Sequence, residues 1–137
     1  MKRALTSILM SVAVLLAISS CATVPTGPLE EGELRLLNME IPEHGNLQSG
    51  IEYRINIIFQ ASGKPEIRRV CMTYSGDGPY CSSVKKVIYG SDEKYIQIPF
   101  YTRMGEYRLE CYVEYVRDGK IRRTNTLMSF ANGVMPW

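Results

Sequence analysis

The sequence predicts an all-β domain, an antiparallel β-sandwich or a partly open barrel, and three observations lead to this expectation. Turn-forming residues recur about every ten residues from Glu33 onward, which is typical of several short strands. Between the turns, apolar and polar residues alternate with the period of two that places them on opposite faces of a strand. The same region lacks the longer period of an amphipathic helix.

The first strand begins with Leu34 and Leu36 and continues to Met39 or Ile41, before the turn-forming residues 42–46. The second strand is clearer, because apolar residues occupy every other position over almost its whole length. Its apolar face comprises Tyr53, Ile55, Ile57 and Phe59.

A third strand over residues 69–74 is expected to turn at residues 75–79 and to return through residues 80–89. Turn-forming residues 90–93 then lead to a strand over residues 95–101. One face of the third strand carries Val70, Met72 and Tyr74, and the other carries Arg69, Cys71 and Thr73. The alternation therefore turns the cysteine of this strand away from the core.

The final hairpin has the strongest local signal, because Asp118-Gly119 is a preferred pair for a two-residue turn. Folding the chain about this turn places Arg117 opposite Lys120 and fixes the pairs beyond it. The expected pairs are Leu109 with Met128, Tyr107 with Phe130, Val113 with Thr124, and Glu114 with Arg123. In this register apolar residues meet apolar residues and opposite charges meet.

About seven strands, with Gly105-Glu106-Tyr107 opening the penultimate one, resemble the immunoglobulin-like sandwiches of bacterial surface proteins. The resemblance covers residues 33–130 and is architectural. The antibody-type pattern is absent, because Trp137 is the only tryptophan and the tyrosine precedes Cys111 by four residues rather than two.

The first twenty-one residues have the order of an export signal, with a positive Lys2 and Arg3, then an apolar run over 8–18 broken by Ser11. The run is too short for a typical membrane-spanning helix. The last four residues, Ile-Ser-Ser-Cys, resemble the lipobox of bacterial lipoproteins, which ends in an obligatory cysteine, here Cys21. In that family the cysteine is acylated, and the signal is cut just before it.

The resemblance implies a signal peptide over 1–20, an acylated Cys21 and flexible tether over 21–32, and a domain over 33–137. It also implies a membrane partner, held through the lipid. Ala22 stands where inner-membrane retention would usually require Asp, which favours the periplasmic face of the outer membrane. The alternatives are an ordinary secretory signal, cut near Ala17 or Ser20, and an amino-terminal anchor helix.

Three cysteines remain once Cys21 is acylated, and an oxidising compartment favours one bonded pair. Cys71 and Cys81 lie at mirror positions about Gly76, so a hairpin turn there sets them opposite each other. Cys111 lies on the apolar face of its strand, and a bond to it would join opposite faces. We therefore predict a Cys71–Cys81 disulfide and a buried free thiol.

The chain has 16 basic and 14 acidic residues, and removing Lys2 and Arg3 with the signal leaves 14 of each. A neutral domain lacks the excess positive charge that nucleic-acid binding requires, so no such partner is expected. Basic residues gather near the end of the chain, where we expect a solvated surface. They are Arg117, Lys120, Arg122 and Arg123.

The sequence offers little catalytic chemistry. His44 is the only histidine and lies in a turn, and the one conceivable nucleophile to pair with it, Cys111, is expected to be buried. The turn Gly76-Asp77-Gly78 supplies too few oxygens for calcium, and neither zinc-ligand spacing nor a phosphate-binding loop occurs. We predict neither enzyme activity nor a metal or cofactor.

Exposed tyrosines are the main candidates for binding. Tyr112 is expected on the outer face of its strand beside Arg108, and the loop residues Tyr80 and Tyr101 at a binding edge. We therefore expect a non-catalytic envelope domain that contacts a protein partner. The alternative is a module that binds glycan or peptidoglycan through these tyrosines, and an enzyme using Cys111 is a third hypothesis.

Overall fold

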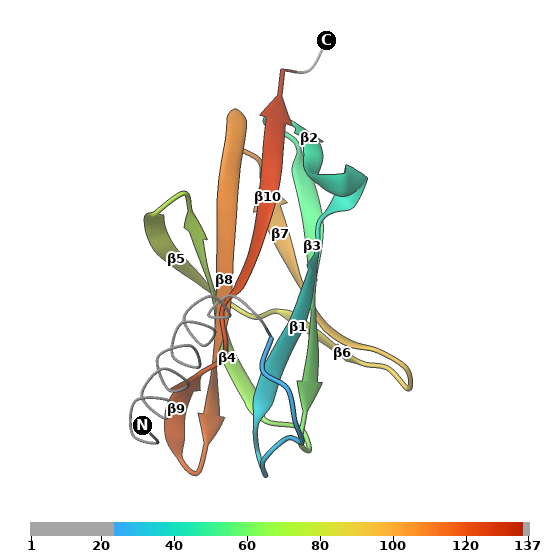
Figure 1. Ribbon diagram of the computed structural model, residues 1–137, viewed down its shortest axis with the longest axis vertical. Coiled ribbons are helices and arrows are strands. Elements are labelled where there is room, and N and C mark those ends of the chain that lie inside the picture. The colour runs from blue at the N-terminus through green and yellow to red at the C-terminus, as the bar shows by residue number, and fades with distance from the viewer. Residues whose placement is uncertain (1–23, 136–137) are drawn as a thin grey trace, which may run out of the picture.

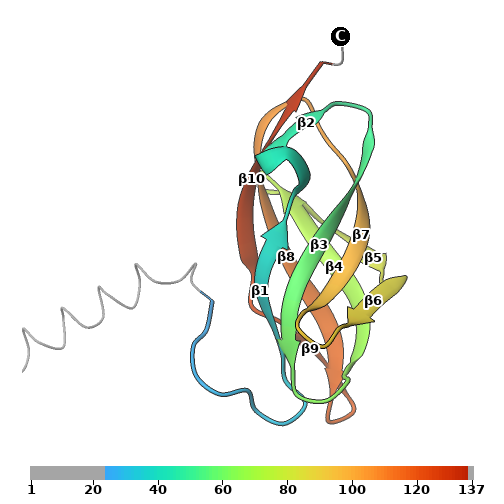
Figure 2. The ribbon, with the colours of Figure 1, turned by 90° about the vertical axis from the view of Figure 1, so that its right-hand side faces the viewer.

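Two β-sheets pack face to face in the computed structural model, which describes residues 24–135 (Figure 1). Figure 2 shows the sheet that contains β1 and β3 in front of the sheet that contains β8 and β10. The strands are β1 (Leu34–Glu40), β2 (Asn46–Gln48), β3 (Glu52–Ala61), β4 (Glu66–Tyr74), β5 (Asp77–Ser83), β6 (Lys86–Tyr89), β7 (Lys94–Tyr101), β8 (Gly105–Arg117), β9 (Lys120–Arg123) and β10 (Leu127–Val134). One short 3-10 helix, η1 (Pro42–Gly45), joins β1 to β2.

The strand order confirms the predicted immunoglobulin-like sandwich. One sheet has the order β1-β3-β7-β6, and the other has the order β2-β10-β8-β4-β5, with β9 paired to β8. In immunoglobulin terms, the first sheet is ABED and the centre of the second is GFC. Neighbouring strands are antiparallel except β2 and β10, which run parallel.

The prediction of a single returning strand over residues 80–89 is wrong. The segment forms two strands in different sheets, since β5 pairs with β4 whereas β6 pairs with β7. The crossing occurs at Val84, whose side chain packs against the core and whose backbone N–H bonds Arg68 O at 3.4 Å. Together with the short strands β2 and β9, this division gives ten strands in the described chain instead of about seven.

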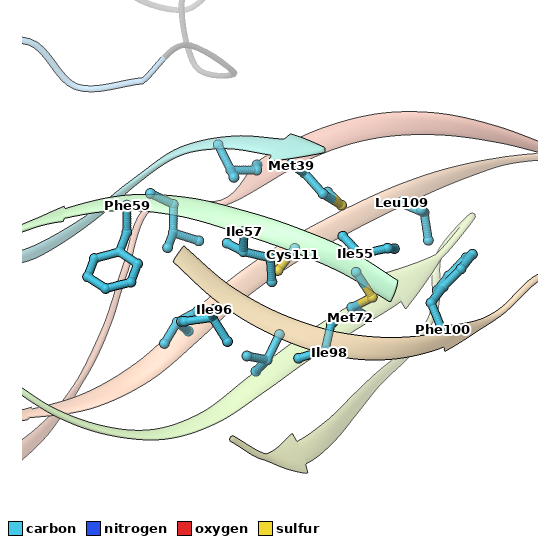
Figure 3. Packing of buried hydrophobic residues seen from close by; sticks show 14 of the residues in the cluster. Met39, Ile55, Ile57, Phe59, Met72, Ile96, Ile98, Phe100, Leu109 and Cys111 are labelled. Carbon is cyan, nitrogen blue, oxygen red and sulfur yellow. The ribbon is translucent and has the colours of Figure 1, made fainter. Parts of the chain in front are cut away.

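The core lies between the sheets and is built from the apolar faces that the alternation predicts (Figure 3). Ile55, Ile57 and Ile96 are fully buried, and Cys111 lies among them from the opposite sheet. A bulge in β1 after Leu36 shifts the alternation by one residue. Of the two predicted ends of the first strand, Met39 is therefore the buried one.

The last hairpin follows the predicted register only in its lower half. Arg117 faces Lys120, Glu114 faces Arg123, and Thr124 exchanges two hydrogen bonds of 2.9 Å with the backbone of Val113. The expected pairs of the upper half are wrong. Leu109 lies opposite Ser129 rather than Met128, and Tyr107 opposite Ala131 rather than Phe130. Both of the misassigned apolar residues lie on the exposed face of β10.

Asn125 accounts for this shift of one residue. Its side-chain Oδ1 accepts the Leu36 N–H, and its Nδ2 donates to Leu36 O, both at 2.9 Å. The amide thus satisfies the backbone hydrogen-bonding groups of β1 as a neighbouring strand would. One residue between Arg123 and Leu127 is consequently left without a partner on β8. The hairpin is therefore divided into β9 and β10.

The residues predicted to form a tether make specific contacts with the domain. Val24 packs against the core, Arg35 donates to Gly27 O at 2.8 Å, and Arg117 pairs with Glu30 at 2.8 Å. Figure 2 shows this segment, in blue, running beside the sandwich before it enters β1. The predicted signal peptide and the acylated Cys21 lie outside the described residues.

Candidate interaction site

Exposed apolar side chains from three segments gather at one end of the sandwich, the upper end in Figure 1. We call this group the apolar tip. Its members are Ile51, Tyr101, Met104, Val134 and Met135, and between 42% and 63% of each remains exposed. The fold brings the segments together, because Ser49 N–H bonds Val134 O at 2.8 Å and Glu52 pairs with Tyr101.

Gly133 allows the loop between β7 and β8 to reach the tip. A Cβ atom at this position would lie 1.7 Å from Arg103 O, so any other residue would push the loop away. The same hypothetical atom would lie 3.3 Å from the Cα of Met104. The close approach therefore places Met104 beside the end of β10.

A polar and aromatic cluster holds this loop against the β4–β5 hairpin. The Arg103 guanidinium lies 4.2 Å from the Tyr74 ring centroid and 5.6 Å from that of Tyr80. It donates to Asp77 at 2.9 Å, and Tyr80 donates to the same carboxylate at 2.9 Å. The bond from Arg103, aided by that from Tyr80, lowers the pKa of Asp77, and the carboxylate raises the pKa of Arg103.

Tyr107 secures the loop from the side of the core. Its hydroxyl lies 2.6 Å from Thr102 Oγ1 and accepts the Arg103 N–H at 3.4 Å. A tyrosine that bonds the chain a few residues upstream, at the start of this strand, is the tyrosine corner of immunoglobulin-like domains. Since two sets of contacts fix the loop, Met104 is presented from an ordered backbone.

The structure places the four predicted binding residues in different environments. Tyr101 belongs to the apolar tip, and Tyr80 is exposed in the neighbouring cluster. Arg108 is exposed on the outer face of β8, where it pairs with Glu110 at 2.8 Å. Tyr112 points outward as expected, but only 9% of it is exposed, because the Arg123 guanidinium covers its ring at 4.0 Å.

The sequence reasoning missed the methionine and aliphatic members of the tip. Ile51 and Met104 stand next to turn glycines, where apolar side chains have no strand face to join. Their position next to a glycine was the feature of the sequence that could have indicated their exposure. The exposure of Val134 depends on the shifted register of β10 and could not be derived from the turn alone.

Cys71 and Cys81 lie directly opposite each other in β4 and β5, and the structure joins them by the expected disulfide. Glu114 lies close enough for these three residues to form a geometric metal-ligand group. The two sulfurs are bonded to each other, so they do not offer thiolates to an ion. The Glu114 carboxylate instead pairs with Arg69 at 2.8 Å.

His44 and Cys111 do not form a catalytic arrangement. His44 is exposed on η1, whereas Cys111 is completely buried in the core. Burial raises the pKa of the Cys111 thiol to about 12, so it stays protonated at neutral pH. A buried protonated thiol acts as a small apolar side chain.

Comparison with known proteins does not assign the chain to a family. No protein-family model matches it, and no curated protein is similar enough to count as a relative. Over residues 24–135, no helix is long and apolar enough to cross a membrane. The function must therefore be inferred from the residues themselves.

Proposed function

We propose that this protein is a lipid-anchored domain of the bacterial envelope that acts by contacting another protein through the apolar tip. The observation that supports this most directly is the exposure of five apolar side chains on one end of the sandwich. Residues 25–33, which lead from the anchor, run through the lower half of Figure 1. Residues 25–33 therefore lie away from the apolar tip, which is at the upper end.

The composition of the tip fits a protein partner. Tyrosine and methionine are enriched in protein interfaces, and methionine adapts to the shape of its neighbour. Two charged residues adjoin the apolar tip: Glu52 accepts a hydrogen bond from the Tyr101 hydroxyl at 3.5 Å, and Arg103 precedes Met104 in the chain. An apolar centre with a polar rim is the usual anatomy of such an interface.

The location belongs to the same proposal. The lipobox at Cys21 supports acylation, and Ala22 supports delivery to the periplasmic face of the outer membrane. Several acyl chains, each contributing about 0.8 kcal/mol per buried CH₂, make attachment effectively permanent. Replacing Cys21 by Ser should leave an uncleaved or soluble product, measured by detergent partition and by the mass of the mature protein.

Site-specific photo-crosslinking in living cells tests the contact surface. A photoreactive residue at position 104 should give one major adduct of defined mass. The matched control is position 92, an exposed turn residue between β6 and β7. Adducts of equal yield at both positions, or none at position 104, would refute the tip as the interface. Met104→Asp should abolish the adduct formed from position 101 while leaving the circular dichroism spectrum unchanged.

Glycan binding is the second candidate, and the exposure of Tyr80 and Tyr101 favours it. Tyr80 is exposed next to the charged pair Asp77–Arg103, and Tyr101 is exposed beside Glu52, so each ring offers stacking with a hydrogen-bonding group nearby. If this function is correct, purified protein stays on isolated cell wall, and Tyr80→Ala with Tyr101→Ala releases it. Retention that survives the double substitution, together with a stoichiometric protein adduct, would reject it.

A further inference from the structure

β9 carries three basic residues and one exposed apolar residue. All four residues of this strand are exposed, and they are Lys120, Ile121, Arg122 and Arg123. Ile121 is 64% exposed although it is aliphatic. Lys120 and Arg122 project from one face of β9, and Ile121 projects from the other, on the same face as Val116 of β8.

None of the three cations of β9 forms an ion pair within residues 24–135, and the Arg123 guanidinium instead lies 4.0 Å from the Tyr112 ring centroid. Arg117 pairs with Glu30, and Arg123 faces Glu114, which is already paired with Arg69. Lys120 and Arg122 have no ion-pair partner among residues 24–135. The only acidic side chain of the β8–β9 turn itself is Asp118.

An acylated Cys21 would hold this side of the domain near the membrane. Cys21 precedes Val24 by three residues, so a fully extended chain spans at most about 11 Å between their Cα atoms. Val24 packs against the core. Pro25 lines a hollow of about 240 Å³ together with Arg117, Arg123 and Thr124. The described chain therefore begins beside β9.

From this placement we infer that β9 and the β8–β9 turn rest on the anionic phospholipid surface of the membrane that carries the anchor. The inference depends on the lipid anchor of the proposed function. Cations near an anionic surface contribute about 1 kcal/mol each, and an exposed aliphatic side chain at the same end of the hairpin can enter the headgroup region. Lys120 and Arg122 would contact lipid phosphates from one face of the hairpin, and Ile121 would enter the headgroup region from the other face.

The contact would orient the domain. Figure 1 places the β8–β9 turn at the lower end and the end of β10 at the upper end. With β9 on the membrane, the apolar tip points away from it, toward a partner in the aqueous phase. A free tether would not fix this direction.

Tryptophan fluorescence of the full acylated chain tests the inference. Ile121→Trp and, as a matched exposed control, Met104→Trp are each made with Trp137→Phe, so that each protein has one tryptophan. Each is reconstituted in vesicles of phosphatidylglycerol and brominated phosphatidylcholine. We expect bromine to quench the tryptophan at position 121 and to leave the one at position 104 as bright as in vesicles without bromine.

Charge dependence identifies the lipid headgroup. Adding K120Q and R122Q should lower the equilibrium constant for contact about 30-fold, at about 1 kcal/mol for each cation. Quenching of the tryptophan at position 121 should also fall as salt rises from about 0.1 M to about 1 M, because the screening length falls from about 10 Å to about 3 Å.

The outcomes separate the inference from the anchor. A protein that lacks the acyl mass and does not float with vesicles contradicts the anchor, and the inference fails with it. A protein that floats but shows equal quenching at both positions overturns only the contact of β9. If quenching at position 121 is equally strong in vesicles without phosphatidylglycerol, the role of the anionic headgroup is overturned.

Discussion

β9 and β10 pair with the same strand, β8, yet their registers are set by different forces. β9 follows directly from the Asp118-Gly119 turn, and its pairing continues to Glu114 and Arg123 as the turn requires. β10 follows Asn125, whose side chain is bonded to β1 in the other sheet. Its pairing with β8 is shifted by one residue.

The difference shows how far a turn controls a hairpin. Because side chains alternate with a period of two, a slip of one residue exchanges the two faces of a strand. Met128 and Phe130 are therefore on the outside, and Leu127 and Ala131 are inside. The exposed residues continue along the outer face of β10 to Val134 of the apolar tip.

The largest change in stability is expected from a comparison of Leu127→Ala with Met128→Ala. Leu127 is 7% exposed and Met128 is 49% exposed. We expect the first to lower the free energy of unfolding by about 3 kcal/mol and the second by less than about 0.5 kcal/mol. Chemical denaturation measures both. The opposite order would restore the register derived from the turn.

Asn125→Ala should have the next largest effect. It leaves the N–H and C=O groups of Leu36 without their partner, and we expect a loss of about 2 kcal/mol in the free energy of unfolding. Asn38→Ala is the control, because that exposed side chain bonds only the adjacent Met39 N–H. A loss no greater than that of the control would show that Asn125 does not set the register.

Gly119→Val tests the part of the hairpin that the turn controls. Asp118 and Gly119 have φ values of 53° and 71°, and a β-branched residue resists positive φ. We expect a loss of about 1.5 kcal/mol, within the range for a strained backbone position. Gly119→Asn should cost less, because asparagine adopts this conformation more readily. Equal losses for the two variants would argue against backbone strain as the cause.

The smallest effect is a dependence on alkaline pH at Cys111, which lies opposite Leu127. Burial raises its pKa from 9.0 to about 12, so above pH 9 the unfolded chain loses this proton while the folded protein keeps it. Stability is therefore lost at about 1.4 kcal/mol per pH unit as pH rises from 9 toward 12. Cys111→Ala removes the thiol, so its unfolding free energy does not show this decrease with pH.

The measurement is the difference in unfolding free energy between wild type and Cys111→Ala at pH 8 and pH 10. We expect the difference to narrow by about 1 kcal/mol at the higher pH, since only the wild type carries the thiol. A constant difference would mean that the thiol ionises in the folded protein, and hence that it is accessible to water.

Part of the candidate site follows from sequence, and part does not. The predicted loop positions of Tyr80 and Tyr101 are wrong, because Tyr80 lies in β5 and Tyr101 is the last residue of β7, but both side chains are exposed as predicted. The alternation of β8 predicts that Tyr112 is available, but it does not show that Arg123 covers the ring. The contact between Asp77 and Arg103 joins the start of β5 to the β7–β8 loop, two segments that are distant in sequence.

The sequence by itself determined the all-β class, the hairpin tip at Asp118-Gly119, and the opposition of Cys71 and Cys81. These features depend on period-two alternation and on turns, which act over a few residues. Only the tertiary structure decided the register of β10, the division of residues 80–89 between two sheets, and the gathering of the apolar tip. Each depends on contacts between segments far apart in the chain, such as Asn125 with Leu36 and Gly133 with Arg103. Local alternation is compatible with either neighbouring register, so long-range hydrogen bonds and close packing make the choice.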